Sequence, residues 1–167
     1  MAAVAVALAA GLAGMAARLS AGQLAEAPEL AIRADASRRR VTPMARADAE
    51  SYGLVLDAYR EPDPEARALR VRDALSGAAD VPLAVAEIGN DVAGIAARLV
   101  EGGNPNLEGD AMTAVLLADA GVRAAVTLAE INLSSANVED DRLGRANELV
   151  EQTAATVRRT GKEEGRG

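Results

Sequence analysis

An aspartate interrupts an apolar helical stripe near the middle of the chain. The residues of this stripe are spaced by three or four positions, as one face of a helix requires: Val41, Met44, Asp48, Tyr52, Val55 and Tyr59. An ionised carboxylate on an inward-facing stripe is costly unless it is paired or hydrogen-bonded. Asp48 is therefore either a carboxylate held in a cleft, with Tyr52 one turn away, or a residue at the stripe's edge that a kink after Pro43 turns outward.

A rigid polar turn, "EGGNPNLEGD" at residues 101–110, breaks the alanine-rich sequence farther along. Asp110 ends this turn and falls on the apolar side of the next expected helix, in its first turn. On sequence alone, the turn is a helix connection with asparagine caps, and Asp110 caps the helix amides. Alternatively, Asn104, Asn106 and Asp110 face a ligand beside a helix N-terminus.

A third carboxylate, Glu87, follows a different pattern. It shares one sector of its expected helix with Asp91 and Arg98. The opposite sector carries the apolar stripe, which consists of Ile88, Val92, Ile95 and Leu99. Periodicity alone therefore predicts that Glu87 is solvated.

The composition limits the chemistry that these residues can perform. The chain has no histidine and no cysteine, so imidazole bases, thiolate metal sites and disulfides are excluded. Acid–base catalysis would depend on Asp, Glu or Tyr. We expect neither a metal site nor a bound cofactor.

The charge distribution argues against a nucleic-acid partner. The net charge is −7, and only 1% of the residues are aromatic, whereas a nucleic-acid site needs a basic stripe and stacking rings. The one basic run is Arg38-Arg39-Arg40. It is either a solvated helix face or a site that captures an anionic substrate tail.

Helical periodicity dominates the 167 residues and predicts an all-α, up-and-down bundle of about five to six helices. We expect one domain over residues 1–157 and a polar disordered tail over 158–167. The helices are expected at residues 2–19, 28–60, 64–77, 82–101, 108–130 and 138–160, with Pro43 kinking or splitting the second.

The uncharged segment Met1–Ala17 raises the question of a membrane span or a signal peptide. It is shorter than the roughly 20 residues of a typical span, and no basic region precedes its apolar stretch. We interpret it as the buried central helix of the bundle and expect a cytoplasmic protein with no membrane partner.

Four stretches, taken together, carry a family likeness over residues 2 to about 150. They are "AAVAVALAAGLAGMAARLS", "ADAESYGLVLDAYREP", "VPLAVAE" and "EGGNPNLEGDAMTAVLLADAGVRAAVTLAEINL". In order and spacing they resemble motifs of the cyclodeaminase/cyclohydrolase family. This family comprises the C-terminal domain of formiminotransferase-cyclodeaminase and its free-standing bacterial relatives.

The resemblance implies an all-helical homodimer that acts on a folate without a metal or redox cofactor. The implied reaction closes 5-formimidoyltetrahydrofolate to 5,10-methenyltetrahydrofolate and releases ammonia. There are two alternatives. One is an enzyme that hydrolyses the methenyl compound, and the other is a catalytically silent dimer that binds a folate or a protein.

The resemblance also assigns residues to the site. Asp48 falls on the family's catalytic aspartate, and Tyr52 and Asp110 are its candidate partners in proton transfer. The other motif positions fall on Glu87, Asn104, Asn106 and Asn132, which are candidates for substrate binding.

Overall fold

The computed structural model describes residues 1–137 and 141–161, and within them every regular element is a helix. Residues 1–137 and 141–161 contain seven α-helices and one short 3₁₀ helix, η1. Their bounds are α1 (Ala2–Arg18), α2 (Ala27–Val41), α3 (Met44–Ala58), α4 (Pro64–Ala78), α5 (Asp80–Gly102), η1 (Pro105–Leu107), α6 (Glu108–Ala136) and α7 (Arg142–Thr160). The predicted all-α class is confirmed.

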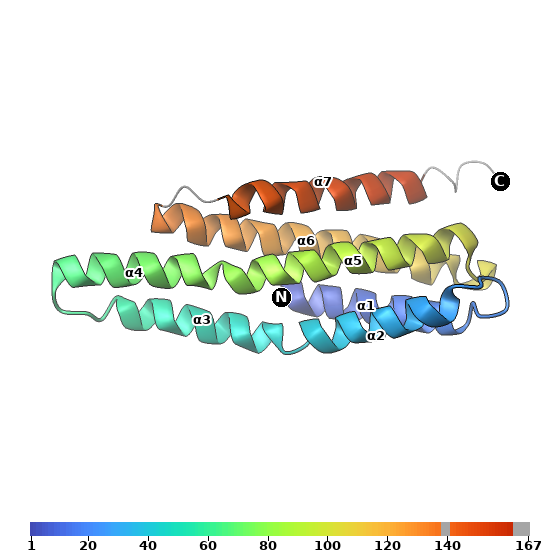
Figure 1. The fold of residues 1–167 in the computed structure, drawn as a ribbon, viewed down its shortest axis with the longest axis horizontal. Helices are drawn as coiled ribbons and strands as arrows, with labels where there is room; N and C mark the ends of the chain where they lie inside the picture. The colour runs from blue at the N-terminus through green and yellow to red at the C-terminus, as the bar shows by residue number, and fades with distance from the viewer. Residues whose placement is uncertain (138–140, 162–167) are drawn as a thin grey trace.

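These helices form five long rods that alternate in direction, so the predicted up-and-down bundle is also confirmed (Figure 1). Helices α2 and α3 form one rod that breaks at Thr42 and Pro43, where the proline was expected to split the helix. Helices α4 and α5 form another and are separated only by Ala79. Pro64 and the Asp63 carboxylate, which accepts hydrogen bonds from two backbone amides, fix the start of α4.

The C-terminal boundaries differ from the prediction. Helix α6 continues six residues beyond 130 and ends at Ala136, where it is capped by Asn137, whose backbone is left-handed (φ 52°). Helix α7 ends at Thr160, the residue where the last helix was expected to end, so residues 158–160, which were also assigned to the polar tail, are helical. Residues 138–140, where the last helix was expected to begin, and residues 162–167 of the tail lie outside the described residues.

The core is built from alanine and small aliphatic side chains, and its helices approach very closely. Val6 of α1 is fully buried between Gly89 of α5 and Gly121 of α6. A Cβ atom added at Gly121 would lie 2.6 Å from Val6 Cγ2, and one added at Gly89 would lie 2.6 Å from Val122 Cγ2. Glycine at these two positions is therefore required by packing.

Helix α1 is not buried all round, which corrects its interpretation as a fully buried helix. It packs against α2, α5 and α6, and these contacts leave one side open. Val4 and Leu8 lie on that side and are 41% and 58% exposed. The part of α1 before Arg18 is uncharged and forms two surfaces, a core face and an exposed apolar face.

Helix α6 is the longest helix and crosses the centre of the bundle. By length and composition alone, the segment Pro105–Ala136 could span a membrane, but the bundle buries 44% of its most apolar window. Its packing against α1, α5 and α7 is that of a core helix.

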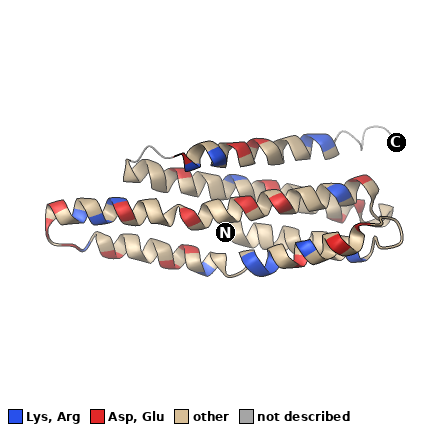
Figure 2. Ribbon diagram, in the orientation of Figure 1, with Lys and Arg blue, Asp and Glu red and all other residues tan. Residues whose placement is uncertain are grey.

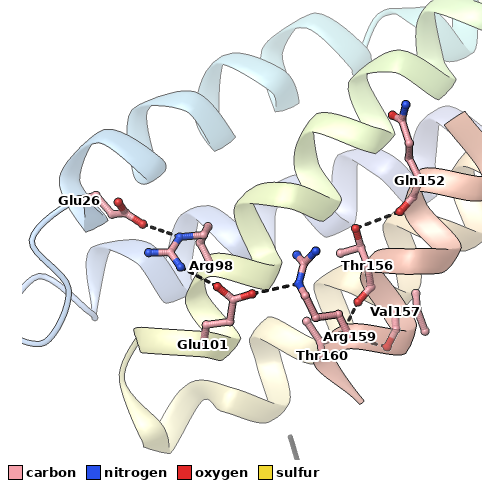
Figure 3. Close-up of polar contacts among 8 residues, drawn as sticks. All are labelled: Glu26, Arg98, Glu101, Gln152, Thr156, Val157, Arg159 and Thr160. Atoms are coloured by element: carbon pink, nitrogen blue, oxygen red, sulfur yellow. Dashed lines mark hydrogen bonds and ion pairs between the residues drawn. The ribbon is translucent and has the colours of Figure 1, made fainter. Parts of the chain in front are cut away.

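Charged residues of both signs lie at the end of the bundle where α5 stops (Figure 2), and their side chains join the rods there (Figure 3). Arg98 donates hydrogen bonds to Glu101 (2.6 Å) and to Glu26 (2.8 Å), and Arg159 of α7 pairs with Glu101 at 3.2 Å. The hydrogen bonds from Arg98 to Glu101 and then to Glu26 raise the pKa of Arg98 above its ordinary value. Because these pairs are exposed, their contribution to stability is small individually.

The close contact at Gly121 makes a quantitative prediction. Gly121→Ala should lower the free energy of unfolding by about 1–3 kcal/mol, because its Cβ would overlap the stiff Val6 side chain. Gly94→Ala is the matched control, since no atom lies within 4 Å of a Cβ at this helical position. It should stabilise the protein by about 0.5–1 kcal/mol. Urea denaturation measures both, and equal effects of the two variants would contradict the close packing.

Candidate functional site

Asp48 lies in a narrow crevice where the N-terminal end of α1 meets α3, α5 and α6. The other residues that line it are apolar: Met1, Ala2, Ala3, Met44, Ala45, Val81, Pro82, Val85 and Leu128. Asp48 is thus the only charged side chain of the crevice. It is half-buried, and its carboxylate has no hydrogen-bond or ion-pair partner among the residues that the structure describes.

The crevice is too small to hold a substrate. Its volume of about 10 Å³ is near the minimum for one water molecule. A ligand that reaches the Asp48 carboxylate must therefore lie at the mouth of the crevice. Tyr52, one turn farther along α3, is 53% exposed and does not line the crevice.

The Gly-Asn-Pro-Asn turn forms a corner that is tied to the segment after α1. The Asn104 backbone N–H donates to Ser20 Oγ (2.8 Å), and Asn104 Nδ2 donates to the Leu19 carbonyl (3.2 Å). Asn104 Oδ1 accepts from the Asn106 N–H at 3.0 Å, which caps η1. A Cβ at Gly103 would lie 2.4 Å from the Leu99 carbonyl oxygen, so this close turn needs glycine.

Asp110 lies in the first turn of α6, beside this corner, and is half-buried. Its carboxylate accepts no hydrogen bond from the helix amides in the described part of the chain, and Leu107 occupies the N-cap position. The interpretation of Asp110 as a helix cap is therefore wrong. The asparagine cap is real, but it belongs to Asn104 and η1.

Within one chain, Asp48 and the Asn104 corner lie at opposite ends of α1. The Asp48 crevice is lined by Met1, Ala2 and Ala3, whereas Asn104 bonds to Leu19 and Ser20. Helix α1 has 17 residues, which at about 1.5 Å per residue separates the two places by roughly 25 Å. Asp48 and Asp110 cannot act on the same atom in a single copy of the chain.

Glu87 and Asn132 are also apart from the crevice. Glu87 is exposed, as periodicity predicted, and lies in a hollow of about 220 Å³ between α5 and α7 together with Arg142 and Arg145. Asn132 Nδ2 donates to the Ala78 carbonyl at 3.1 Å and so ties α6 to the end of α4. Neither residue lines the Asp48 crevice.

A larger groove runs between α1 and α2. Its volume is about 510 Å³, which is within the range of small-molecule sites. It is lined by Ala3, Val4, Ala7, Leu8, Gly11, Leu12, Arg38 and Thr42. Sequence reasoning missed this groove because it treated α1 as buried on all sides. The available signal was the basic run, which lies in the last turn of α2.

The described residues contain no group of three or more His, Cys, Asp or Glu side chains that could hold a metal ion. The polar groups that remain for chemistry are carboxylates, amides, tyrosine hydroxyls and arginines. They can transfer protons, accept hydrogen bonds and stabilise charge.

The bundle is similar to a solved structure of a helical enzyme. The structure of formiminotetrahydrofolate cyclodeaminase from Thermotoga maritima superimposes with a TM-score of 0.72, covering 95% of this chain and 80% of that one. The sequence identity is 24%, so this likeness concerns the fold.

Residues 1–152 match the family described as formiminotransferase-cyclodeaminase, and the chain belongs to this family. The resemblance seen in its sequence motifs is thereby confirmed. A curated relative, the methenyltetrahydrofolate cyclohydrolase of Methylorubrum extorquens, is 34% identical over 126 residues. That match covers 71% of this chain and 61% of the relative, so the chain spans about three fifths of the relative's length.

Proposed function

We propose that this protein is an enzyme of folate one-carbon chemistry that forms or consumes 5,10-methenyltetrahydrofolate. The observation that carries the proposal is the Asp48 carboxylate, the only charged side chain in an apolar crevice. Apolar walls weaken dielectric screening, so an ionised carboxylate there attracts a nearby cation more strongly than it would in water. The methenyl compound is such a cation.

In the preferred reaction, 5-formimidoyltetrahydrofolate closes its ring. The N10 nitrogen attacks the formimidoyl carbon, a C–N10 bond forms, and the bond from that carbon to the terminal nitrogen breaks. Asp48 would accept the N10 proton and pass it to the leaving nitrogen, which departs as ammonia; the carboxylate, ionised again, would then stabilise the cationic product. Tyr52 and Asp110 remain candidate proton donors, and the amides of Asn104, Asn106 and Asn132 remain candidate pterin ligands with Glu87.

A cyclohydrolase reaction is the second candidate, and the relative from Methylorubrum extorquens supports it by name and by its 34% identity. Here water would add to the methenyl carbon, and Asp48 would take a proton from that water. The bond from this carbon to N5 would then break, N5 would take up a proton, and the carbon would remain on N10 as a formyl group. Both reactions use the same carboxylate beside the same carbon. An enzyme of either kind would work in the cytoplasm.

We further propose that the enzyme is a homodimer that buries the open side of α1. Val4 and Leu8 on α1, and Leu116, Leu128 and Ile131 on α6, are large apolar side chains exposed along two helices that pack together. No charged residue precedes Arg18 in the chain. Two copies with a net charge of −7 each could therefore meet along α1 without bringing like charges into contact.

A dimer would also complete the site. In a two-fold symmetric interface the same patch meets itself, so two α1 helices that pack antiparallel exchange their ends. Asp48 of one copy would then lie near the asparagine corner and Asp110 of the other. This arrangement accounts for motif residues that are about 25 Å apart in one chain.

The catalytic role of Asp48 is tested by turnover. Asp48→Asn should lower kcat at least about 100-fold, because the amide cannot accept a proton, and the helical circular dichroism should be unchanged. Asp57→Asn, on the exposed side of the same helix, should keep wild-type activity. Absorbance at the methenylfolate band gives the rate.

The same assay separates the two reactions. Appearance of the band from formimidoyl substrate identifies the deaminase, and decay of added methenyl substrate identifies the hydrolase. Retained activity in Asp48→Asn would remove this residue from catalysis. If the wild-type protein turns over neither substrate, the remaining alternative is a catalytically silent protein that binds a folate or another protein.

The dimer is tested by charge insertion on the open side of α1. Leu8→Glu should convert the dimer to a monomer, because an unpaired carboxylate would be buried in the interface. The oligomeric mass is the readout, since Leu8 also lines the groove between α1 and α2. Leu69→Glu is the control, since Leu69 is 54% exposed on α4, similar to Leu8 at 58%. Light scattering after size-exclusion chromatography measures the mass. A wild-type monomer with full activity would contradict the dimer.

A further inference from the structure

The three consecutive arginines at the end of α2 have no partners, although the chain as a whole is acidic. In the described part of the chain, no hydrogen bond or ion pair involves the guanidinium groups of Arg38, Arg39 and Arg40. Most of the other described arginines are paired, as in Arg18–Asp35 at 3.0 Å and Arg46–Glu50 at 2.7 Å, although Arg33 and Arg158 also lack a partner in the described part of the chain. An unneutralised basic run in a protein with a net charge of −7 is a local site of positive potential.

Two of these arginines border hollows, and the third does not. Arg38 lies at the edge of the 510 Å³ groove between α1 and α2, and a Cβ at Gly11 would lie 3.8 Å from Arg38 Cδ. The aliphatic stem of Arg38 thus lies beside α1. Arg38 and Arg39 also border a second hollow of about 350 Å³ with Thr42 and Pro43. Arg40 lines neither hollow.

The residues that line the two hollows fit one class of ligand best. The floor of the groove consists of uncharged α1 residues from Ala3 to Leu12, which suits an apolar or aromatic body. At its edge, the guanidinium groups and the Thr42 hydroxyl offer several donors to a carboxylate. The fitting ligand is therefore a flat or apolar molecule that carries one or more carboxylates at one end.

The groove leads toward the catalytic carboxylate. Ala3 lines both the groove and the Asp48 crevice, and Arg38 precedes Asp48 by ten residues along the α2–α3 rod. At about 1.5 Å per residue, the two charged groups are roughly 15 Å apart along the rod. An extended ligand of that length could contact both at once. Asp48 repels carboxylates, and the arginines attract them, so the charges define its orientation.

We propose that the α1–α2 groove binds the carboxylate-bearing end of the substrate through Arg38 and Arg39, while the reacting end lies at Asp48. This inference rests on the proposed folate reaction and adds to it a binding site and an orientation. The arginines hold the substrate in both the ground state and the transition state. Their loss should therefore change KM and leave kcat almost unchanged.

The kinetic test uses the full-length protein and three variants. Arg38→Ala and Arg39→Ala should each raise KM roughly fivefold to tenfold with kcat within about twofold, because a charge-assisted hydrogen bond is lost. Arg40→Ala removes the same charge one position away and should keep the wild-type KM. Equal KM shifts in all three variants would indicate a non-specific charge effect and overturn the site, as would three unchanged values.

A binding test does not depend on turnover. Calorimetry with p-aminobenzoylglutamate, which carries an aromatic ring and two carboxylates, should show binding to the wild type and to Arg40→Ala. The double variant Arg38→Ala/Arg39→Ala should bind it at least about tenfold more weakly at the same oligomeric state. A double variant that binds the probe normally, or that changes mass, would overturn the groove assignment.

The two tests separate the possible failures. Turnover by the wild type together with normal probe binding by the double variant would refute the groove and leave the proposed reaction intact. Loss of probe binding in the double variant, with no turnover by the wild type, would support the groove and refute the reaction.

Discussion

The absence of side chains at Gly89 and Gly121 is the constraint on which the rest of the structure depends. These glycines let Val6 enter between α5 and α6 and bring the backbone of α1 close to both helices. Alanine at Ala9, Ala10 and Ala13, all fully buried, continues this close packing along α1. Interiors of this density tolerate little added volume. Helix α1 is thereby held in a defined position between α5 and α6. Asp48 lies beside its N-terminal end, and the Asn104 corner is hydrogen-bonded to the segment that follows its C-terminal end.

The small size of its side chains also explains why one apolar side of α1 is exposed. A helix of small residues fills little space, so its neighbours α2, α3, α5 and α6 can approach it closely without enclosing it. Its remaining side has no charge to solvate it, and Val4 and Leu8 are exposed there. Exposed apolar surface of this kind is typical of interaction sites. The groove toward α2, the crevice at Asp48 and the proposed dimer face all border this one side, so a ligand and a second subunit would meet there.

Sequence periodicity predicted most of the fold, because the bundle consists of amphipathic helices with proline and glycine at their ends. It predicted the break at Pro43 and the solvated position of Glu87, and it left open whether Asp48 points inward. It failed where the outcome depends on neighbouring helices. One helix wheel cannot show that the neighbours of α1 leave one of its sides open, or that the Asn104 side-chain amide donates to the Leu19 carbonyl. The motif order suggested one compact site, whereas the described chain separates Asp48 from Asp110 by about the length of α1.

The central claim is that one working site takes Asp48 from one copy and the Asn104–Asp110 corner from another. Co-expression of Asp48→Asn subunits with Asp110→Asn subunits tests it directly. Each variant alone should be inactive, but half of the mixed population would be heterodimers, and each heterodimer would hold one intact site. The mixture should recover about a quarter of the wild-type rate if the interface is two-fold symmetric. A mixture that forms heterodimers and remains as inactive as its parents would contradict a shared site.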